Sequence, residues 1–147
     1  MYKCKHFKIS ELVSKIVYNK FGEFAWKFFD EDILRDLDVI RDYHGTAITI
    51  NDWGFGGSLQ QCGLRCNLDP LVKGKTQIYC SAHIMGKAFD LHSKGNNQRL
   101  YKDIEYLIKA GKLKTIKRLE SPNSTKFNWV HIDSFQAGSN IPEVFTA

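Results

Sequence analysis

Hydrophobic residues recur at helical spacing in three parts of the chain. Residues 10–18 and 30–44 each place apolar side chains along one face, and Asp30 is suited to cap the second helix. Residues 100–110 form an amphipathic pattern that ends at Gly111. The sequence therefore predicts three helices. The apolar positions of the first two are Leu12, Ile16 and Val17, and Ile33, Leu34, Leu37 and Ile40.

Alternating and β-branched segments predict strands in the rest of the chain. Residues 46–50 alternate and lead into a glycine-rich loop at 51–57, and residues 78–92 are expected to be a strand or an extended loop. The runs 114–119 and 127–132 flank a polar loop and predict an antiparallel hairpin. Together with the helices, these strands predict an α+β fold with a small antiparallel sheet and helices on one face.

The composition fits a single globular domain. Of 147 residues, 43% are hydrophobic and 25% are charged, so the chain can fill one core. Residues 1–45 are expected to form a helical part, and residues 46–133 the core that carries the functional site. No stretch reaches the roughly 20 apolar residues of a membrane span, and the N-terminus lacks the apolar segment of a secretory signal. We therefore expect a protein made in the cytoplasm, without a membrane span.

The formal net charge of +5 favours an anionic partner without identifying it. The basic residues are scattered, with local concentrations at 3–8 and 109–118. No helix-turn-helix, zinc finger or RNA-binding strand pattern accompanies them, so a nucleic-acid partner is not expected. A chain of this size and apolar content needs no disulfide bonds, so free thiols are expected for Cys4, Cys62, Cys66 and Cys80.

Two short segments carry residues suited to metal chemistry. The segment SAHIMGKAFD at 81–90 places His83 and Asp90 seven residues apart, and WVHID at 129–133 adds His131 on a predicted strand. Two histidines and one carboxylate are a ligand set of catalytic zinc sites, in which a fourth position stays open for water. A structural zinc site more often has four protein ligands. These residues therefore predict a catalytic zinc centre.

The spacing of these segments resembles a known family. SxHxxGxAxD followed roughly forty residues later by WxH is similar to the zinc peptidases that include D-Ala-D-Ala carboxypeptidases, dipeptidases, phage L-alanoyl-D-glutamate endolysins and the Hedgehog signalling domain. Asn-Asp-Trp at 51–53, Gly-Gly at 56–57 and Gly-Leu-Arg at 63–65 resemble elements of the phage-associated branch. The resemblance covers residues 46–133.

The resemblance implies a zinc cleft on the sheet face opposite the helices, with His83, Asp90 and His131 as ligands. It further implies that Arg65 helps to hold the carboxylate or carbonyl of the substrate, and that Ser81 supports the site. The implied reaction is hydrolysis of a peptide bond in bacterial peptidoglycan, by a carboxypeptidase or endopeptidase of phage or prophage origin. Neither the bond nor the oligomeric state follows from the resemblance.

The general base is the open point of this interpretation. Many relatives place Glu or Asp three residues before the final histidine, where this chain has Asn128, whose amide cannot act as a base. Glu120 ends the first strand of the predicted hairpin and is the favoured base if the register puts it beside His131. Asp133 lies on the same strand face as His131 and is the alternative, although it is better suited to orient that histidine. A chain without a base would be an inactive zinc-binding domain with a binding or virion structural role.

Overall fold

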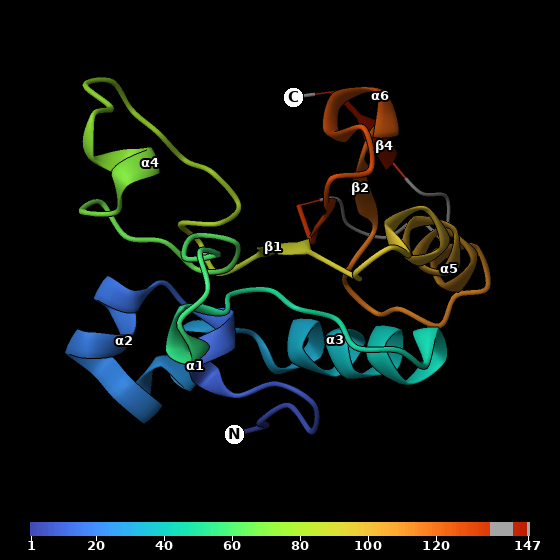
Figure 1. Cartoon of the computed structure of the whole chain (residues 1–147), viewed down its shortest axis with the longest axis horizontal. Coiled ribbons are helices and arrows are strands. Elements are labelled where there is room, and N and C mark those ends of the chain that lie inside the picture. The colour runs from blue at the N-terminus through green and yellow to red at the C-terminus, as the bar shows by residue number, and fades with distance from the viewer. Residues whose placement is uncertain (136–142, 147) are drawn as a thin grey trace.

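A computed structural model describes residues 1–135 and 143–146 (Figure 1). The elements before the sheet are α1 (Ile9–Leu12), α2 (Lys15–Phe21), the 3-10 helix η1 (Gly22–Phe28), α3 (Glu31–His44), the 3-10 helix η2 (Trp53–Phe55) and α4 (Pro70–Lys73). The strands are β1 (Ala88–Leu91), β2 (Arg118–Glu120), β3 (Val130–Asp133) and β4 (Glu143–Phe145). Helix α5 (Asn97–Lys109) lies between β1 and β2, and α6 (Pro122–Thr125) lies between β2 and β3. The predicted α+β class is confirmed.

The four strands form one sheet in the order β1-β3-β2-β4. Strand β3 pairs antiparallel with both β1 and β2, so the predicted hairpin is present with α6 inside its connection. Strand β4 pairs parallel with β2, and the sheet is therefore mixed rather than purely antiparallel as predicted. Both edges of β3 are already paired, so β4 joins the sheet at the outer edge of β2.

The two faces of the sheet differ in polarity because side chains alternate along each strand. The apolar face packs into the core that α3 and α5 also line, and α5 contacts β3. The opposite face is polar. Helices therefore cover one face of the sheet, and the other face is free for a site. The apolar set is Phe89, Leu91, Leu119, Val130 and Ile132, and the polar set is Asp90, Arg118, Glu120, His131 and Asp133.

Two of the three predicted helices are present as α3 and α5, but the predicted helix at residues 10–18 is divided into α1 and α2. The division falls at Val13 and Ser14, where Val13 makes a parallel bridge to Leu64. The Ser14 hydroxyl accepts a hydrogen bond from the Val17 amide and so caps α2. A tertiary contact and a local cap therefore override the helical periodicity.

The predicted strand at residues 46–50 is wrong except at one position. Thr49 forms an isolated antiparallel bridge with His92, and their backbone groups exchange two hydrogen bonds of 2.8 Å. The chain then turns toward α1, where the Asn51 amide donates to the Glu11 carbonyl at 3.0 Å. Only a single bridge forms because the next backbone donor, the Asn51 amide, binds a carbonyl of α1 instead of a neighbouring strand.

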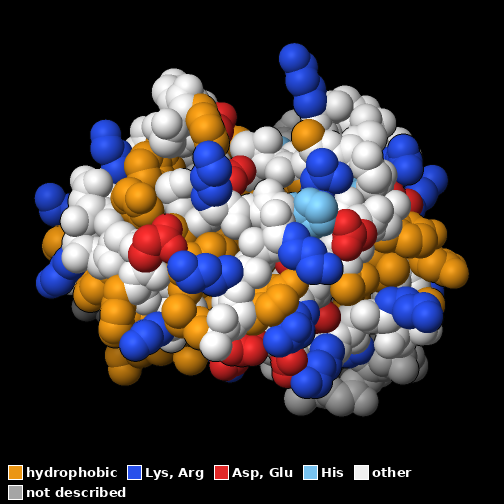
Figure 2. Space-filling view, turned by 90° about the horizontal axis from the view of Figure 1, so that it is seen from below, with side chains coloured by type: hydrophobic (Ala, Val, Ile, Leu, Met, Phe, Trp, Pro, Cys, Tyr) orange, Lys and Arg blue, Asp and Glu red, His pale blue; other side chains and the backbone are white. Residues whose placement is uncertain are grey.

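Lys and Arg side chains are spread over the surface with acidic side chains between them, as the face in Figure 2 shows. This distribution agrees with the scattered positions of the basic residues in the sequence. None of the helices described for residues 1–135 and 143–146 is long and apolar enough to span a membrane.

Candidate metal centre

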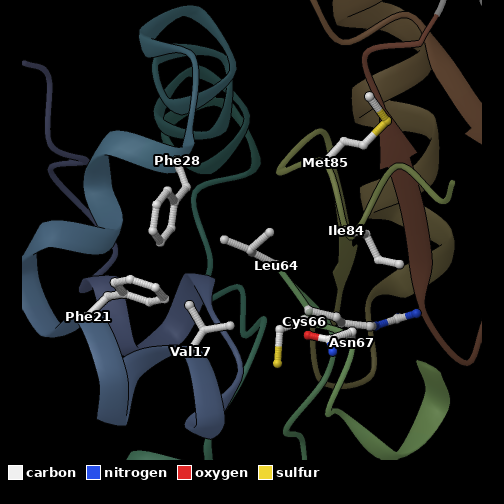
Figure 3. Close-up of a pocket in the computed structure, with 9 residues that line it drawn as sticks. Val17, Phe21, Phe28, Leu64, Cys66, Asn67, Ile84 and Met85 are labelled. Atoms are coloured by element: carbon white, nitrogen blue, oxygen red, sulfur yellow. The ribbon is translucent and has the colours of Figure 1, made fainter. Parts of the chain in front are cut away.

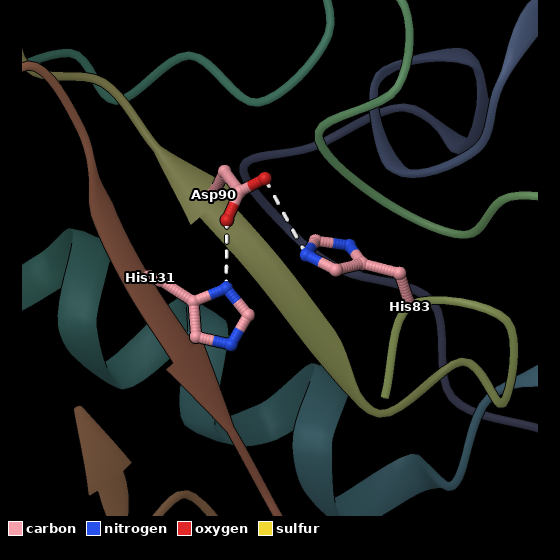
Figure 4. Close-up of side chains that lie close together, drawn as sticks. All are labelled: His83, Asp90 and His131. Carbon is pink, nitrogen blue, oxygen red and sulfur yellow. Dashed lines mark hydrogen bonds and ion pairs between the residues drawn. The ribbon is translucent and has the colours of Figure 1, made fainter. Parts of the chain in front are cut away.

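Three side chains from distant parts of the chain converge on the polar face of the sheet (Figure 4). His83 lies in the turn before β1, Asp90 lies on β1, and His131 lies directly opposite Asp90 on β3. One donor atom from each side chain lies within 4.8 Å of the other two. His131 Nδ1 is 2.7 Å from Asp90 Oδ1, and His83 Nε2 is 3.4 Å from Asp90 Oδ2. The sequence-predicted ligands are thus brought together, and this group could hold a metal ion.

The His83 ring is held by a backbone contact on its far side. Its Nδ1 lies 2.9 Å from the Gly63 carbonyl oxygen, an acceptor, so this nitrogen carries a hydrogen, and Nε2 faces Asp90 Oδ2. Gly63 itself lies against α1, since a Cβ at this position would come within 2.0 Å of the Leu12 carbonyl oxygen. Only glycine allows this approach, so the orientation of His83 depends on a glycine twenty residues earlier.

The His131 ring is held by a carboxylate. Its Nε2 lies 3.3 Å from Asp133 Oδ2, and Asp133 is fixed by Arg118 at 3.3 Å and by the Phe135 amide at 3.0 Å. Nδ1 therefore remains for Asp90 or a cation. Histidines that bind metals almost always donate their other ring hydrogen to a carboxylate or a carbonyl, and both histidines here have such an acceptor.

The carboxylates and the imidazoles of the centre shift the pKa values of one another. Burial alone would raise the pKa of Asp90, but the hydrogen bonds from His131 and His83 outweigh it and hold that pKa well below its usual range. Burial would lower the pKa of His131, but its hydrogen bonds to Asp133 and Asp90 raise it from 6.5 to about 9. A metal ion that binds here must therefore displace a proton from His131 at neutral pH.

Glu120 lies in the same cavity as the three candidate ligands. Continuing the β2–β3 register by one residue from Leu119 and Ile132 brings Glu120 opposite His131. Its side chain is 9% exposed and lines a cavity of about 390 Å³ that His83, Asp90 and His131 also line. Burial raises the pKa of Glu120, although the nearby His131 partly offsets this effect. A carboxylate with a raised pKa is a better proton acceptor at neutral pH.

Of the other residues considered in the sequence, Arg65 and Ser81 line the cavity and Asn128 does not. Arg65 Nη2 donates to Asp90 Oδ2 at 3.1 Å, and the guanidinium also lines the cavity, so it contacts a candidate ligand directly. Ser81 lines the cavity, and its backbone carbonyl accepts a hydrogen bond from the Ile84 amide in the turn that carries His83. Asn128 is exposed and is not among the residues that line the cavity.

Several residues that line the cavity were missed in the sequence, among them Arg118 and Phe145. Arg118 pairs with Asp133 and lies under the ring of Phe145 at 4.2 Å, and the Phe145 ring contacts the His131 ring at 5.6 Å. The position of Arg118 two residues before Glu120 could have placed it on the same strand face. No comparable signal marks Phe145, because it reaches the cavity only through the pairing of β4 with β2.

The remaining histidines and the cysteines do not line the cavity of the candidate metal centre. His44 is buried between Asp103 Oδ2 at 2.7 Å and Ser93 Oγ at 2.8 Å, where it links the end of α3 to the middle of α5 and to the segment before α5. His92 lies 3.7 Å from the Cys62 sulfur. All four cysteines are free thiols, as expected.

Comparisons with protein-family models, with curated proteins and with solved structures found no significant match to this chain. The class of site is therefore defined by its own geometry. It consists of two imidazoles and one carboxylate at a buried point on a sheet, with a second carboxylate in the same cavity.

Proposed function

We propose that this chain is a zinc-dependent peptidase that hydrolyses a peptide bond in bacterial peptidoglycan. The observation that carries the proposal is the convergence of His83, Asp90 and His131 in one cavity with the buried carboxylate of Glu120. Imidazole and carboxylate ligands suit zinc, and three protein ligands leave one coordination position for water or substrate. The resemblance of the motifs to zinc peptidases supports the same reaction.

The residues of the cavity have separate roles in the proposed reaction. His83, Asp90 and His131 would hold the zinc ion, which would supply a Lewis acid for the scissile carbonyl and for the activation of water. Glu120 accepts the proton of the attacking water and then returns it to the leaving amine. Asp133 and the Gly63 carbonyl keep the two imidazoles in the required tautomers. Arg65 orients Asp90, and its guanidinium would also bind an oxygen atom of the substrate.

The proposed biological setting follows from the resemblance. The phage-associated motifs support a phage or prophage product that reaches the cell wall after lysis or in a virion. The net charge of +5 supports attraction to an anionic wall polymer.

The test combines metal analysis with mass spectrometry of purified peptidoglycan after digestion. Wild-type protein is expected to bind one equivalent of zinc and to release peptide fragments that identify the bond. His83→Ala is expected to lose both properties. Glu120→Gln is expected to keep the metal and to lose about 10²- to 10⁴-fold in rate, as for removal of a general base.

The second candidate is an inactive zinc-binding domain with a binding or virion structural role. The observation that favours it is Asn128, which stands where many relatives have the base and is exposed outside the cavity. A zinc-loaded wild type that releases no fragments from any peptidoglycan would decide for this candidate. A large loss of rate in Glu120→Gln would decide against it.

A further inference from the structure

The cavity of the candidate metal centre is lined by two guanidinium groups that come from different sides of the sheet. Arg65 donates to Asp90 on β1, whereas Arg118 lies on β2, and β3 separates these two strands. Arg118 precedes Glu120 by two residues, so the two side chains lie on the same face of β2. Arg65 is therefore the neighbour of Asp90, and Arg118 is the neighbour of Glu120.

The charges that line the cavity suit an anionic group once a divalent ion is bound. The two guanidiniums face three carboxylates, those of Asp90, Glu120 and Asp133. A zinc ion with neutral imidazole ligands would turn the excess of one negative charge into an excess of one positive charge. One carboxylate of a substrate would balance that charge, and the pairing is stronger in a buried cavity than on the surface.

Arg118 is fixed by its neighbours on β3 and β4. Its Nη1 lies 3.3 Å from Asp133 Oδ2, its Nε lies 3.2 Å from Glu143 Oε1, and its guanidinium lies 4.2 Å from the centre of the Phe145 ring. Among the residues that the structure describes, no partner of Nη2 is found. A guanidinium held in this way is preorganised, and Nη2 is the nitrogen that remains for a further oxygen acceptor.

The proposed reaction brings the leaving group of the substrate close to Arg118. Glu120 returns the proton to the leaving amine, so that nitrogen must come within hydrogen-bond distance of the Glu120 carboxylate. The carbon of an α-carboxylate lies only about 2.5 Å from the nitrogen of the same residue. Residues two apart on a strand are separated by roughly 6.5 to 7 Å, which an arginine side chain can span. The α-carboxylate of the residue after the scissile bond would therefore come within reach of Arg118.

Arg65 is less suited to this carboxylate because its guanidinium is used on the side of Asp90. Its Nε donates to the Gln61 carbonyl, and its Nη2 donates to Asp90 Oδ2 at 3.1 Å. Arg65 also lines a second cavity, of about 450 Å³, which Figure 3 shows between the N-terminal helices and the segment of Met85. The lining of that second cavity is mainly apolar, with Phe28 among its side chains, and burial of a carboxylate there would be costly.

We propose that Arg118 is a specificity-determining residue that binds the α-carboxylate of the residue after the scissile bond. The proposal rests on the proposed function, since it assigns a substrate contact in the same cavity. Both bonds that the resemblance suggests are followed by such a carboxylate: the C-terminal one in D-Ala-D-Ala, and the free one of a D-glutamate that continues the chain through its side chain. Bonds within an ordinary peptide chain lack it, because an amide takes its place.

The test measures the Kd values of two thiols for the zinc-loaded protein by calorimetry. The compounds are 3-mercapto-2-methylpropanoic acid and 3-mercapto-2-methylpropanamide, which bind zinc through sulfur and differ only at the carboxylate. We expect wild type to bind the acid about 10- to 100-fold more tightly, as for a hydrogen bond between charged groups.

A third thiol distinguishes the two sources of the carboxylate. It carries a 2-carbamoylethyl group in place of the methyl group and so resembles a D-glutamate that is joined through its side chain. Tighter binding of the methyl acid would assign the carboxylate to C-terminal D-alanine, and tighter binding of the carbamoylethyl acid would assign it to D-glutamate. Arg118 would bind the carboxylate in both cases.

Arg118→Gln, at saturating zinc, is expected to bring the Kd values of the acid and the amide close together. A role of Arg118 in holding Asp133 alone would instead weaken both compounds and keep their ratio. Arg118→Lys keeps the charge but not the forked donors, so it is expected to retain only part of the preference. Arg35→Gln is the matched control, because Arg35 also pairs with a carboxylate, that of Glu31 at 3.2 Å, and lies 4.1 Å from the Tyr2 ring, but does not line the cavity.

Three results would overturn the assignment of Arg118. They are equal Kd values of the acid and the amide for wild type, a preference that survives in both Arg118 variants, and a preference that is lost in Arg65→Gln but kept in Arg118→Gln. Binding of the amide in these cases leaves the proposed function standing. Failure of both compounds to bind would overturn the proposed function as well.

Discussion

At the scale of single residues, the candidate ligands depend on neighbours that do not touch a metal themselves. Asp133 accepts from His131 Nε2 at 3.3 Å and is held by Arg118. Replacing it by asparagine keeps the shape but removes the charge that fixes the imidazole. We expect Asp133→Asn to weaken zinc binding by about 10- to 100-fold, measured by competition with a chromophoric chelator.

Asp42→Asn is the control for this prediction. Asp42 also pairs with a histidine, since its Oδ1 lies 2.6 Å from His6 Nε2, but this pair is exposed and neither residue lines the cavity. The same chemical change is expected to leave zinc affinity unaltered there. Equal effects of the two substitutions would contradict an orienting role for Asp133.

The raised pKa of His131 predicts how the stability of the metal-free protein depends on pH. The folded pKa of about 9 lies above the ordinary value of 6.5, so its contribution is fully present below 6.5 and is lost as pH rises through 9. The free energy of unfolding should fall over this window by at most about 1.4 kcal/mol per pH unit from this one proton.

Urea denaturation at a series of pH values in the presence of EDTA measures this dependence. His131→Gln removes the titrating group, so the difference between wild type and variant isolates its contribution from that of the thiols. If the two proteins have the same slope between pH 6.5 and 9, the raised pKa of His131 is wrong.

The candidate ligands could be predicted from the sequence because their spacing is itself a motif. His83, Asp90 and His131 were predicted together and are found together. The partners that orient them were only partly accessible. Asp133 follows from strand alternation, whereas the Gly63 carbonyl that binds His83 depends on a tertiary approach to α1, which leaves no periodic signal.

At the scale of elements, the close contact of Gly63 with α1 makes a testable link between packing and the site. A Cβ at Gly63 would lie 2.0 Å from the Leu12 carbonyl oxygen, a backbone atom that cannot rotate away. We expect Gly63→Ala to destabilise the protein by about 1 to 3 kcal/mol, the usual cost of overpacking. It should also weaken zinc binding, because the shifted carbonyl no longer orients His83.

Gly74→Ala serves as the comparison, since a Cβ there would meet no heavy atom within 4 Å and its φ of −86° suits alanine. Thermal unfolding and zinc titration of the two variants test the prediction. Unchanged zinc affinity in a destabilised Gly63→Ala protein would show that the carbonyl does not set the orientation of His83.

The elements that the sequence predicted well are those whose stability is local. Helices α3 and α5 have long amphipathic patterns and were located to within a few residues. The strand predicted at 114–119 is shortened to β2, because the Asp36 carboxylate accepts the amides of Lys114, Thr115 and Ile116 at 2.7 to 2.9 Å. A buried carboxylate on α3 thus takes the place of a strand partner. No pattern within residues 114–119 indicates this contact.

At the scale of the whole molecule, the candidate metal centre joins segments that are far apart in the chain. His83, Asp90 and His131 lie on a turn and two strands, and the Gly63 carbonyl ties this group to α1. Because an ion that binds all three side chains binds only the folded chain, its binding free energy adds to the stability of the whole fold. Such coupling is absent from any single segment.

Removal of the metal is therefore expected to lower the melting temperature of the entire protein in one transition. At free zinc about 1,000 times its Kd, binding adds about 4 kcal/mol to the free energy of unfolding, and a chelator removes this amount. Calorimetry of zinc-loaded protein with and without EDTA measures the shift. His83→Ala lacks one ligand and should unfold at nearly the same temperature in both conditions, so an equal EDTA effect in that variant would place the ion elsewhere than at these three side chains.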